Sequence, residues 1–118
     1  MKLEASQLPI DIAGVRLQRL RQYLATDGRR FVVHDLGNQT GIDYGDAYAV
    51  ALLLIGSDAV KATWLVYHTC GVGVIDTRAF SEGFVRQPFI CDECEETVDP
   101  DDLLYDLHCE LQATVVIE

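Results

Sequence analysis

The sequence lacks any apolar run long enough to cross a membrane. The longest apolar stretch covers residues 47–55, whereas a membrane-spanning helix needs about 20 residues. The N-terminal residues Met1-Lys2-Leu3-Glu4 also lack the apolar core of a signal peptide. We therefore expect a cytoplasmic protein with reduced thiols and no membrane association.

Basic residues and catalytic motifs are scarce as well. The 118 residues include nine Lys and Arg against nineteen Asp and Glu, a net charge of −10. This balance excludes a protein whose whole surface binds nucleic acid or anionic lipid. The sequence contains no GxSxG, P-loop, HExxH or GxGxxG motif. It therefore predicts a protein that is not an enzyme.

Charge is distributed unevenly along the chain. Residues 1–60 hold six basic and seven acidic residues, whereas residues 61–118 hold three basic and twelve acidic ones, seven of them between Asp92 and Asp102. Five arginines of the first half lie close together in sequence: Arg16, Arg19, Arg21, Arg29 and Arg30. Either these regions are solvated faces, or they form a basic and an acidic patch that bind a partner protein or a second copy of the chain.

Helical patterns dominate residues 1–62. Apolar residues recur at helical spacing over residues 11–25, with Asp11 as the expected N-cap. Residues 31–36 are compatible with a strand or with a short helix. A second helix is predicted for residues 44–55, after Asp43 as N-cap. Because this helix is apolar nearly all round, we expect it to be largely buried.

Strand patterns dominate residues 63–118. Residues 62–70 are rich in β-branched and aromatic residues, which favours a strand with His68 and Cys70 on one face. Residues 71–86 indicate a hairpin or loop, and residues 103–117 alternate between apolar and polar, with Cys109 on the apolar side. We therefore predict an α+β protein with a helical half, residues 1–62, and a small β-rich half, residues 63–118.

The clearest functional signal is the CxxC formed by Cys91 and Cys94 after a short apolar segment. A tight turn of this spacing brings two thiolates within reach of one metal ion. His68 and Cys70 can supply a second pair of ligands, and the glycine that follows Cys70 permits a sharp turn. The sequence therefore predicts a zinc site made of His68, Cys70, Cys91 and Cys94.

A redox-active dithiol and a CxxC without metal are the alternatives. A reactive dithiol needs a thiol pKa that is lowered by cations or by a helix N-terminus. Acidic residues surround the two sulfurs instead, and their charge should oppose thiolate formation and attract a divalent cation: Asp92, Glu93, Glu95 and Glu96. Zinc is therefore favoured, and a closed site with four protein ligands leaves no position for a catalytic water.

Residues 64–112 resemble a zinc ribbon, and the elements before them resemble a winged helix, in which residues 36–44 are similar to the turn of a helix-turn-helix. Small transcription-associated and adaptor proteins have a similar arrangement. With the charge pattern, the resemblance implies a zinc-stabilised, non-enzymatic adaptor that binds another protein. The alternatives are a DNA-binding regulator that uses the arginines of residues 16–30, and a CxxC thiol oxidoreductase. DNA binding is less favoured because the expected recognition helix carries only Asp46 as a charge.

Overall fold

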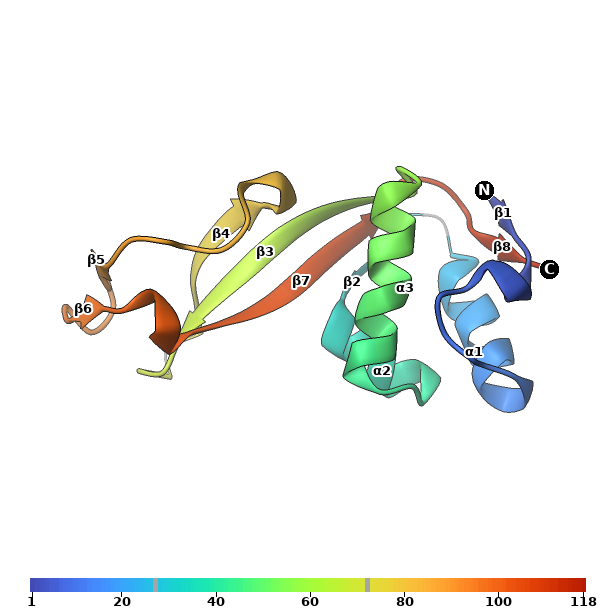
Figure 1. Cartoon of the computed structure of the whole chain (residues 1–118), viewed down its shortest axis with the longest axis horizontal. Helices are drawn as coiled ribbons and strands as arrows, with labels where there is room; N and C mark the ends of the chain where they lie inside the picture. The colour runs from blue at the N-terminus through green and yellow to red at the C-terminus, as the bar shows by residue number, and fades with distance from the viewer. Residues whose placement is uncertain (27, 72) are drawn as a thin grey trace. The chain divides into compact units, whose positions relative to one another are not determined.

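Helices and strands both contribute to the structure, which belongs to the α+β class (Figure 1). The computed structural model describes residues 1–26, 28–71 and 73–118. They form two units: unit 1 comprises residues 1–62 and 108–118, and unit 2 comprises residues 63–107. The sequence had assigned all of residues 63–118 to one half. Residues 108–118 instead lie in unit 1, because their strands pair with strands near the N-terminus.

The first helix, α1 (Gly14–Leu24), begins later than the helix expected over residues 11–25. Its N-cap is Ala13, so the expected cap Asp11 lies outside the helix. Leu20 and Leu24 are fully buried and fix the inner face of α1. Three short elements also belong to unit 1: β1 (Lys2–Leu3), η1 (Ala5–Gln7) and β8 (Val116–Ile117), of which β1 and β8 pair in parallel.

Residues 31–36, which the sequence left as either strand or helix, contain the end of a strand and the start of a helix. The strand β2 (Arg30–Val32) leads directly into the helix α2 (Val33–Thr40). The α2 helix ends at Gly41, which has a left-handed φ of 77° and donates its N–H to the Gly37 carbonyl over 2.9 Å. A glycine is favoured there because other residues rarely adopt this conformation.

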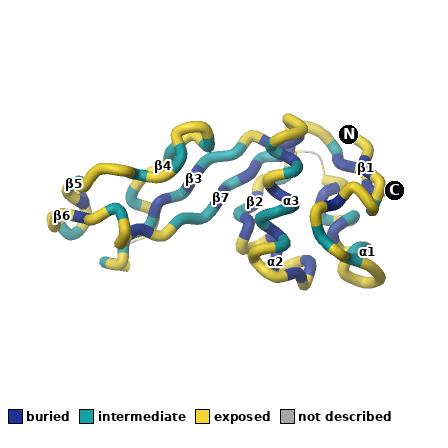
Figure 2. The backbone as a smooth tube through the Cα atoms, in the orientation of Figure 1, coloured by how far each residue is buried: buried dark blue, intermediate teal, exposed yellow. Residues whose placement is uncertain are grey.

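The helix α3 (Tyr44–Gly56) begins where the sequence predicts, because the Asp43 carboxylate accepts the N–H of Asp46 over 2.8 Å. The expectation that α3 is largely buried is wrong. Figure 2 shows buried, intermediate and exposed residues along α3. Tyr44 and Leu52 are 45% and 40% exposed. Apolar side chains of α3 therefore lie on its exposed side as well as in the core. None of the helices among the described residues is long and apolar enough to cross a membrane.

Four strands form the main sheet, in the order β2-β7-β3-β4 (Figure 1). β3 (Val60–His68) pairs antiparallel with β4 (Val74–Ala79), and β7 (Leu103–Leu111) pairs antiparallel with β2. The alternation predicted for residues 103–117 is confirmed as far as Leu111, and Cys109 is fully buried. Both boundaries between the units fall inside strands, within β3 and within β7.

Unit 2 has a small apolar core. Four buried residues form its centre: Val66, Cys91, Val98 and Leu103. A two-stranded sheet, β5 (Phe89–Ile90) with β6 (Thr97–Val98), lies on either side of the CxxC in sequence. Aromatic rings pack on β3 and β7, with Trp64 stacked on Phe80 and in edge contact with Tyr105. Two 3-10 turns complete the unit: η2 (Phe80–Glu82) and η3 (Pro100–Asp102).

Candidate metal centre

The structure brings together the four residues that the sequence predicts as ligands. His68 is the last residue of β3, Cys70 lies in the turn that follows, and Cys91 and Cys94 lie between β5 and β6. The ligand atoms of these four side chains all lie within 4.8 Å of one another, and the cluster could hold a metal ion. In a tetrahedral site with metal–sulfur distances of about 2.3 Å, ligand atoms are about 3.8 Å apart. The four side chains are therefore near the spacing that one shared ion requires.

The first pair of ligands is set by a turn at the end of β3. The Gly71 N–H donates to the His68 carbonyl over 3.1 Å, and Gly71 has a left-handed φ of 80°. Cys70 therefore lies beyond the strand and not on the strand face that the sequence predicts for it. Even so, the turn directs the Cys70 sulfur toward the same cluster as the His68 ring.

The second pair is set by a tighter turn between β5 and β6. The Cys91 N–H donates to the Glu96 carbonyl over 2.9 Å, and the Glu95 N–H donates to the Cys91 carbonyl over 2.8 Å. Closing this turn places Glu95 at a φ of 60°, which is uncommon for a residue other than glycine. The backbone strain lies directly after Cys94, so it is stored in the turn that holds two of the four ligands.

Backbone N–H groups of this turn affect the pKa values of the cysteine thiols. The N–H of Cys94, helped by that of Glu93, hydrogen-bonds the Cys91 sulfur and lowers the pKa of Cys91 to about 7, against the effect of burial. The pKa of Cys94 is raised: the Glu96 N–H lowers it, but burial and the sulfurs of Cys91 and Cys70 outweigh that effect. The acidic neighbours were expected to oppose thiolate formation at this motif. At Cys91 the directed amides prevail, so a thiolate suited to bind a cation forms near neutral pH.

The side chains at the centre are close and well shielded. The Cys94 sulfur lies 3.6 Å from Nδ1 of His68. Cys91 is fully buried in the unit 2 core beside Val66, while the other three ligands are half-buried. Cys70, Cys91 and Cys94 are free thiols, and Cys109 belongs to the core of unit 1, outside the cluster.

The amide donors of Glu93, Cys94 and Glu96 and the strained Glu95 were missed by sequence reasoning. A glycine after the second cysteine would have indicated the left-handed position in this turn. The chain has Glu95 there, so this signal is absent from the sequence.

The five arginines predicted as a partner-binding patch differ in their contacts, and their role in binding a partner stays a prediction. Arg21 donates its Nε–H to the Ile117 carbonyl over 2.9 Å. The Arg29 guanidinium lies 4.3 Å from the centre of the Tyr23 ring, and Arg30 lies 3.6 Å from the Glu110 carboxylate. Arg21 and Arg29 therefore contact other parts of unit 1, whereas Arg30 makes only an exposed ion pair, which contributes little to stability. Arg16 and Arg19 are exposed on α1.

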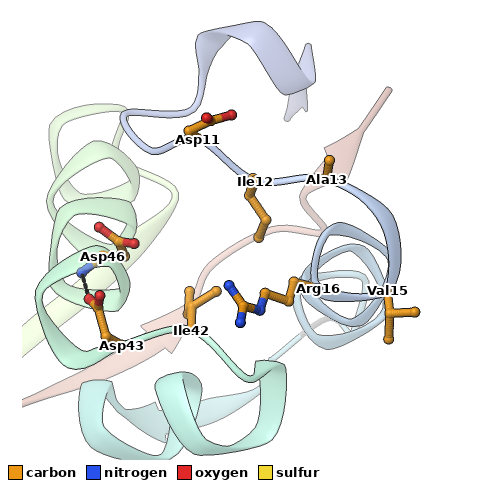
Figure 3. A pocket seen from close by; sticks show the side chains of 8 residues that line it. All are labelled: Asp11, Ile12, Ala13, Val15, Arg16, Ile42, Asp43 and Asp46. Atoms are coloured by element: carbon orange, nitrogen blue, oxygen red, sulfur yellow. Dashed lines mark hydrogen bonds between the residues drawn. The ribbon is translucent and has the colours of Figure 1, made fainter.

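Arg16 borders a pocket of about 350 Å³ in unit 1 (Figure 3). Its guanidinium extends from α1 toward Ile42, as Figure 3 shows. Three carboxylates also line this pocket: Asp11, Asp43 and Asp46. The local charge around Arg16 is therefore mixed, which weakens the expectation of a basic surface at this end of α1.

Comparisons with protein-family models, with curated proteins and with solved structures give no match for this chain.

Proposed function

We propose that the chain is a zinc-binding, non-enzymatic adaptor whose second unit is stabilised by the metal and binds another protein. The observation that carries the proposal is the cluster of four ligand atoms within 4.8 Å of one another. Three thiolates and one imidazole form a ligand set typical of structural zinc sites. With four protein ligands the metal has no open position, so its role is to stabilise the fold.

The small core of unit 2 supports this role. Only a few apolar side chains are buried at its centre, and Cys91 is one of them. Small, loop-rich units of this kind commonly depend on a metal or on disulfides. Zinc would join the turn after β3 to the turn between β5 and β6, and so connect segments that are far apart in sequence.

The proposed architecture is a winged helix with the zinc-ribbon-like residues 63–107 placed within its strand hairpin. The element order α1, β2, α2, α3, β3 and β7 supports it, as do the positions of β7 beside β2 and β3 in the sheet. In this arrangement α3 takes the place of a recognition helix. Its exposed residues Tyr44 and Leu52 suit contact with protein better than contact with phosphates or base edges.

The two alternatives have less support. A DNA-binding regulator needs free cations, but Arg21 and Arg29 already contact groups inside unit 1, and Arg30 lies beside the Glu110 carboxylate. A thiol oxidoreductase needs an accessible nucleophile. Cys91 has the lowered pKa, but its side chain is fully buried.

The test is metal content by elemental analysis of freshly purified protein, with a free-thiol count before and after a chelator. We expect one zinc per chain and three thiols that become reactive on chelation, those of Cys70, Cys91 and Cys94. Cys109→Ser is the matched control, because that thiol lies outside the cluster and its loss should leave the zinc content unchanged. Protein without metal, or with two thiols joined in a disulfide, would contradict the proposal.

A further inference from the structure

A second pocket in unit 2 lies beside the edge strand β4 and the segment that leads into the CxxC. Its volume is about 400 Å³. Apolar side chains from both segments line it, including Ile75, Val85 and Ile90. Ile90 is 65% exposed, so a large apolar side chain stands at the pocket with little cover from the rest of unit 2.

Carboxylates occupy two N–H donors of the edge strand β4. The Thr77 N–H donates to the Asp76 carboxylate and the Ala79 N–H donates to the Glu82 carboxylate, each over 2.9 Å. Charged side chains on an edge strand disfavour the addition of a foreign strand. We therefore expect a binding partner at this pocket to insert side chains and not to extend the sheet.

Charge identifies the chemistry of that partner. Unit 2 carries two basic and ten acidic side chains, a net charge of −8. Asp76 and Asp92 contribute two negative charges to the pocket walls, and Arg78 contributes one positive charge. An apolar pocket with an acidic rim complements an apolar side chain that has basic neighbours.

The pocket depends on the candidate metal centre. Ile75, Val85 and Phe89 line the pocket and also pack against the core cluster that contains Cys91. Asp92 follows Cys91 directly in the turn. A metal that fixes this turn therefore also fixes two walls of the pocket.

We infer that this pocket binds a flexible segment of a partner protein, with one large apolar side chain in the pocket and Lys or Arg side chains on either side of it. The inference rests on the proposed function, because it names the class of partner that the zinc-stabilised unit would bind. The apolar anchor gives affinity, and the acidic surface of unit 2 accelerates encounter and selects basic segments.

The experiment uses the full zinc-loaded chain and a fluorescent synthetic peptide with a central leucine flanked by lysines. Fluorescence anisotropy should show binding that weakens as salt is added. Replacing the central leucine with serine, or the lysines with glutamates, should abolish it. Ile90→Ser should weaken binding about tenfold, as expected for loss of an anchoring contact. Leu104→Ser is the matched control: Leu104 is 62% exposed in the same unit and does not line the pocket, so binding should persist.

Zinc content is measured on each sample to separate the two proposals. Zinc-loaded protein that does not bind the peptide, or that loses binding equally in Ile90→Ser and Leu104→Ser, overturns this inference and leaves the proposed function standing. Protein without zinc overturns the proposed function and this inference with it. A dimer, seen by light scattering, that Ile90→Ser dissociates would show that a second copy of the chain occupies the pocket, which also overturns the inference.

Discussion

The two units differ in how many apolar side chains they bury. Among the described residues, unit 1 contains eighteen buried apolar side chains, supplied by three helices and the paired strands around them. Unit 2 contains six: Trp64, Val66, Cys91, Val98, Leu103 and Leu107. Unit 1 has the core of an ordinary small domain, whereas unit 2 places one of its few core positions in the candidate metal centre. Under the proposed function, unit 1 is stable through packing, whereas unit 2 depends on a bound metal.

Removal of the metal should have the largest effect and should act on one unit. Structural zinc contributes about 10 kcal/mol or more in small domains, so a chelator or Cys91→Ser should unfold residues 63–107 and leave unit 1 folded. Hydrogen exchange read residue by residue measures this directly. Cys109→Ser, in the core of unit 1, is the control that should keep both zinc and protection in unit 2. Simultaneous loss of protection in both units would show that they form one cooperative core.

A cavity made in the core of unit 1 should destabilise unit 1 and leave unit 2 unchanged. Leu54 of α3 is fully buried, so Leu54→Ala should lower the free energy of unfolding of unit 1 by about 2–5 kcal/mol. Zinc content and exchange protection around Cys91 should not change. Loss of zinc in this variant would contradict the separation of the two units. Leu52→Ala on the exposed side of the same helix should cost far less.

The N-cap of α3 offers a smaller change confined to unit 1. Asp43→Ala removes the acceptor of the Asp46 N–H and should cost about 1 kcal/mol in chemical denaturation. Asp43→Asn keeps a side-chain oxygen at the same position, so it should remain close to the unsubstituted protein. Equal losses in the two variants would mean that the charge matters and not the hydrogen bond.

The smallest expected effect is an increase in the stability of unit 2. Glu95→Gly relieves the left-handed φ after Cys94, and after the greater chain entropy of glycine is subtracted it should raise stability by about 0.5 kcal/mol. The chelator concentration needed to unfold unit 2 measures this. Glu93→Gly removes the same charge in the same turn without relieving a left-handed residue, so it should give no gain. A gain in both would assign the effect to charge.

Local signals in the sequence predicted local features well. Asp43 marked the start of α3, and the spacing of His68, Cys70, Cys91 and Cys94 marked the residues that the structure brings together. These features depend on residues that are near in sequence or on the chemistry of a few side chains.

Features that depend on distant partners could not be read in the same way. The return of residues 108–118 to unit 1 follows from strand pairing, such as that of Phe31 with Cys109, which has no local signature. The exposed face of α3 is apolar like its buried face, so composition alone could not tell them apart. The pKa of Cys91 depends on the direction of the Cys94 and Glu93 amides, whereas the sequence displays only the nearby carboxylates.

The positions of the two unit boundaries determine how much entropy unit 1 loses by holding unit 2 as an insertion. The chain leaves unit 1 through β3 and returns through its neighbour β7, so for unit 1 the whole of unit 2 is one long loop between adjacent strands. The entropy of closing a flexible loop grows only with the logarithm of its length, by about 0.6 kcal/mol for each doubling. If the cluster binds a metal as proposed, unit 1 can therefore stay closed while residues 63–107 change between an ordered, metal-bound state and a disordered, metal-free one. A fall in metal supply would then change one part of the chain without unfolding the rest.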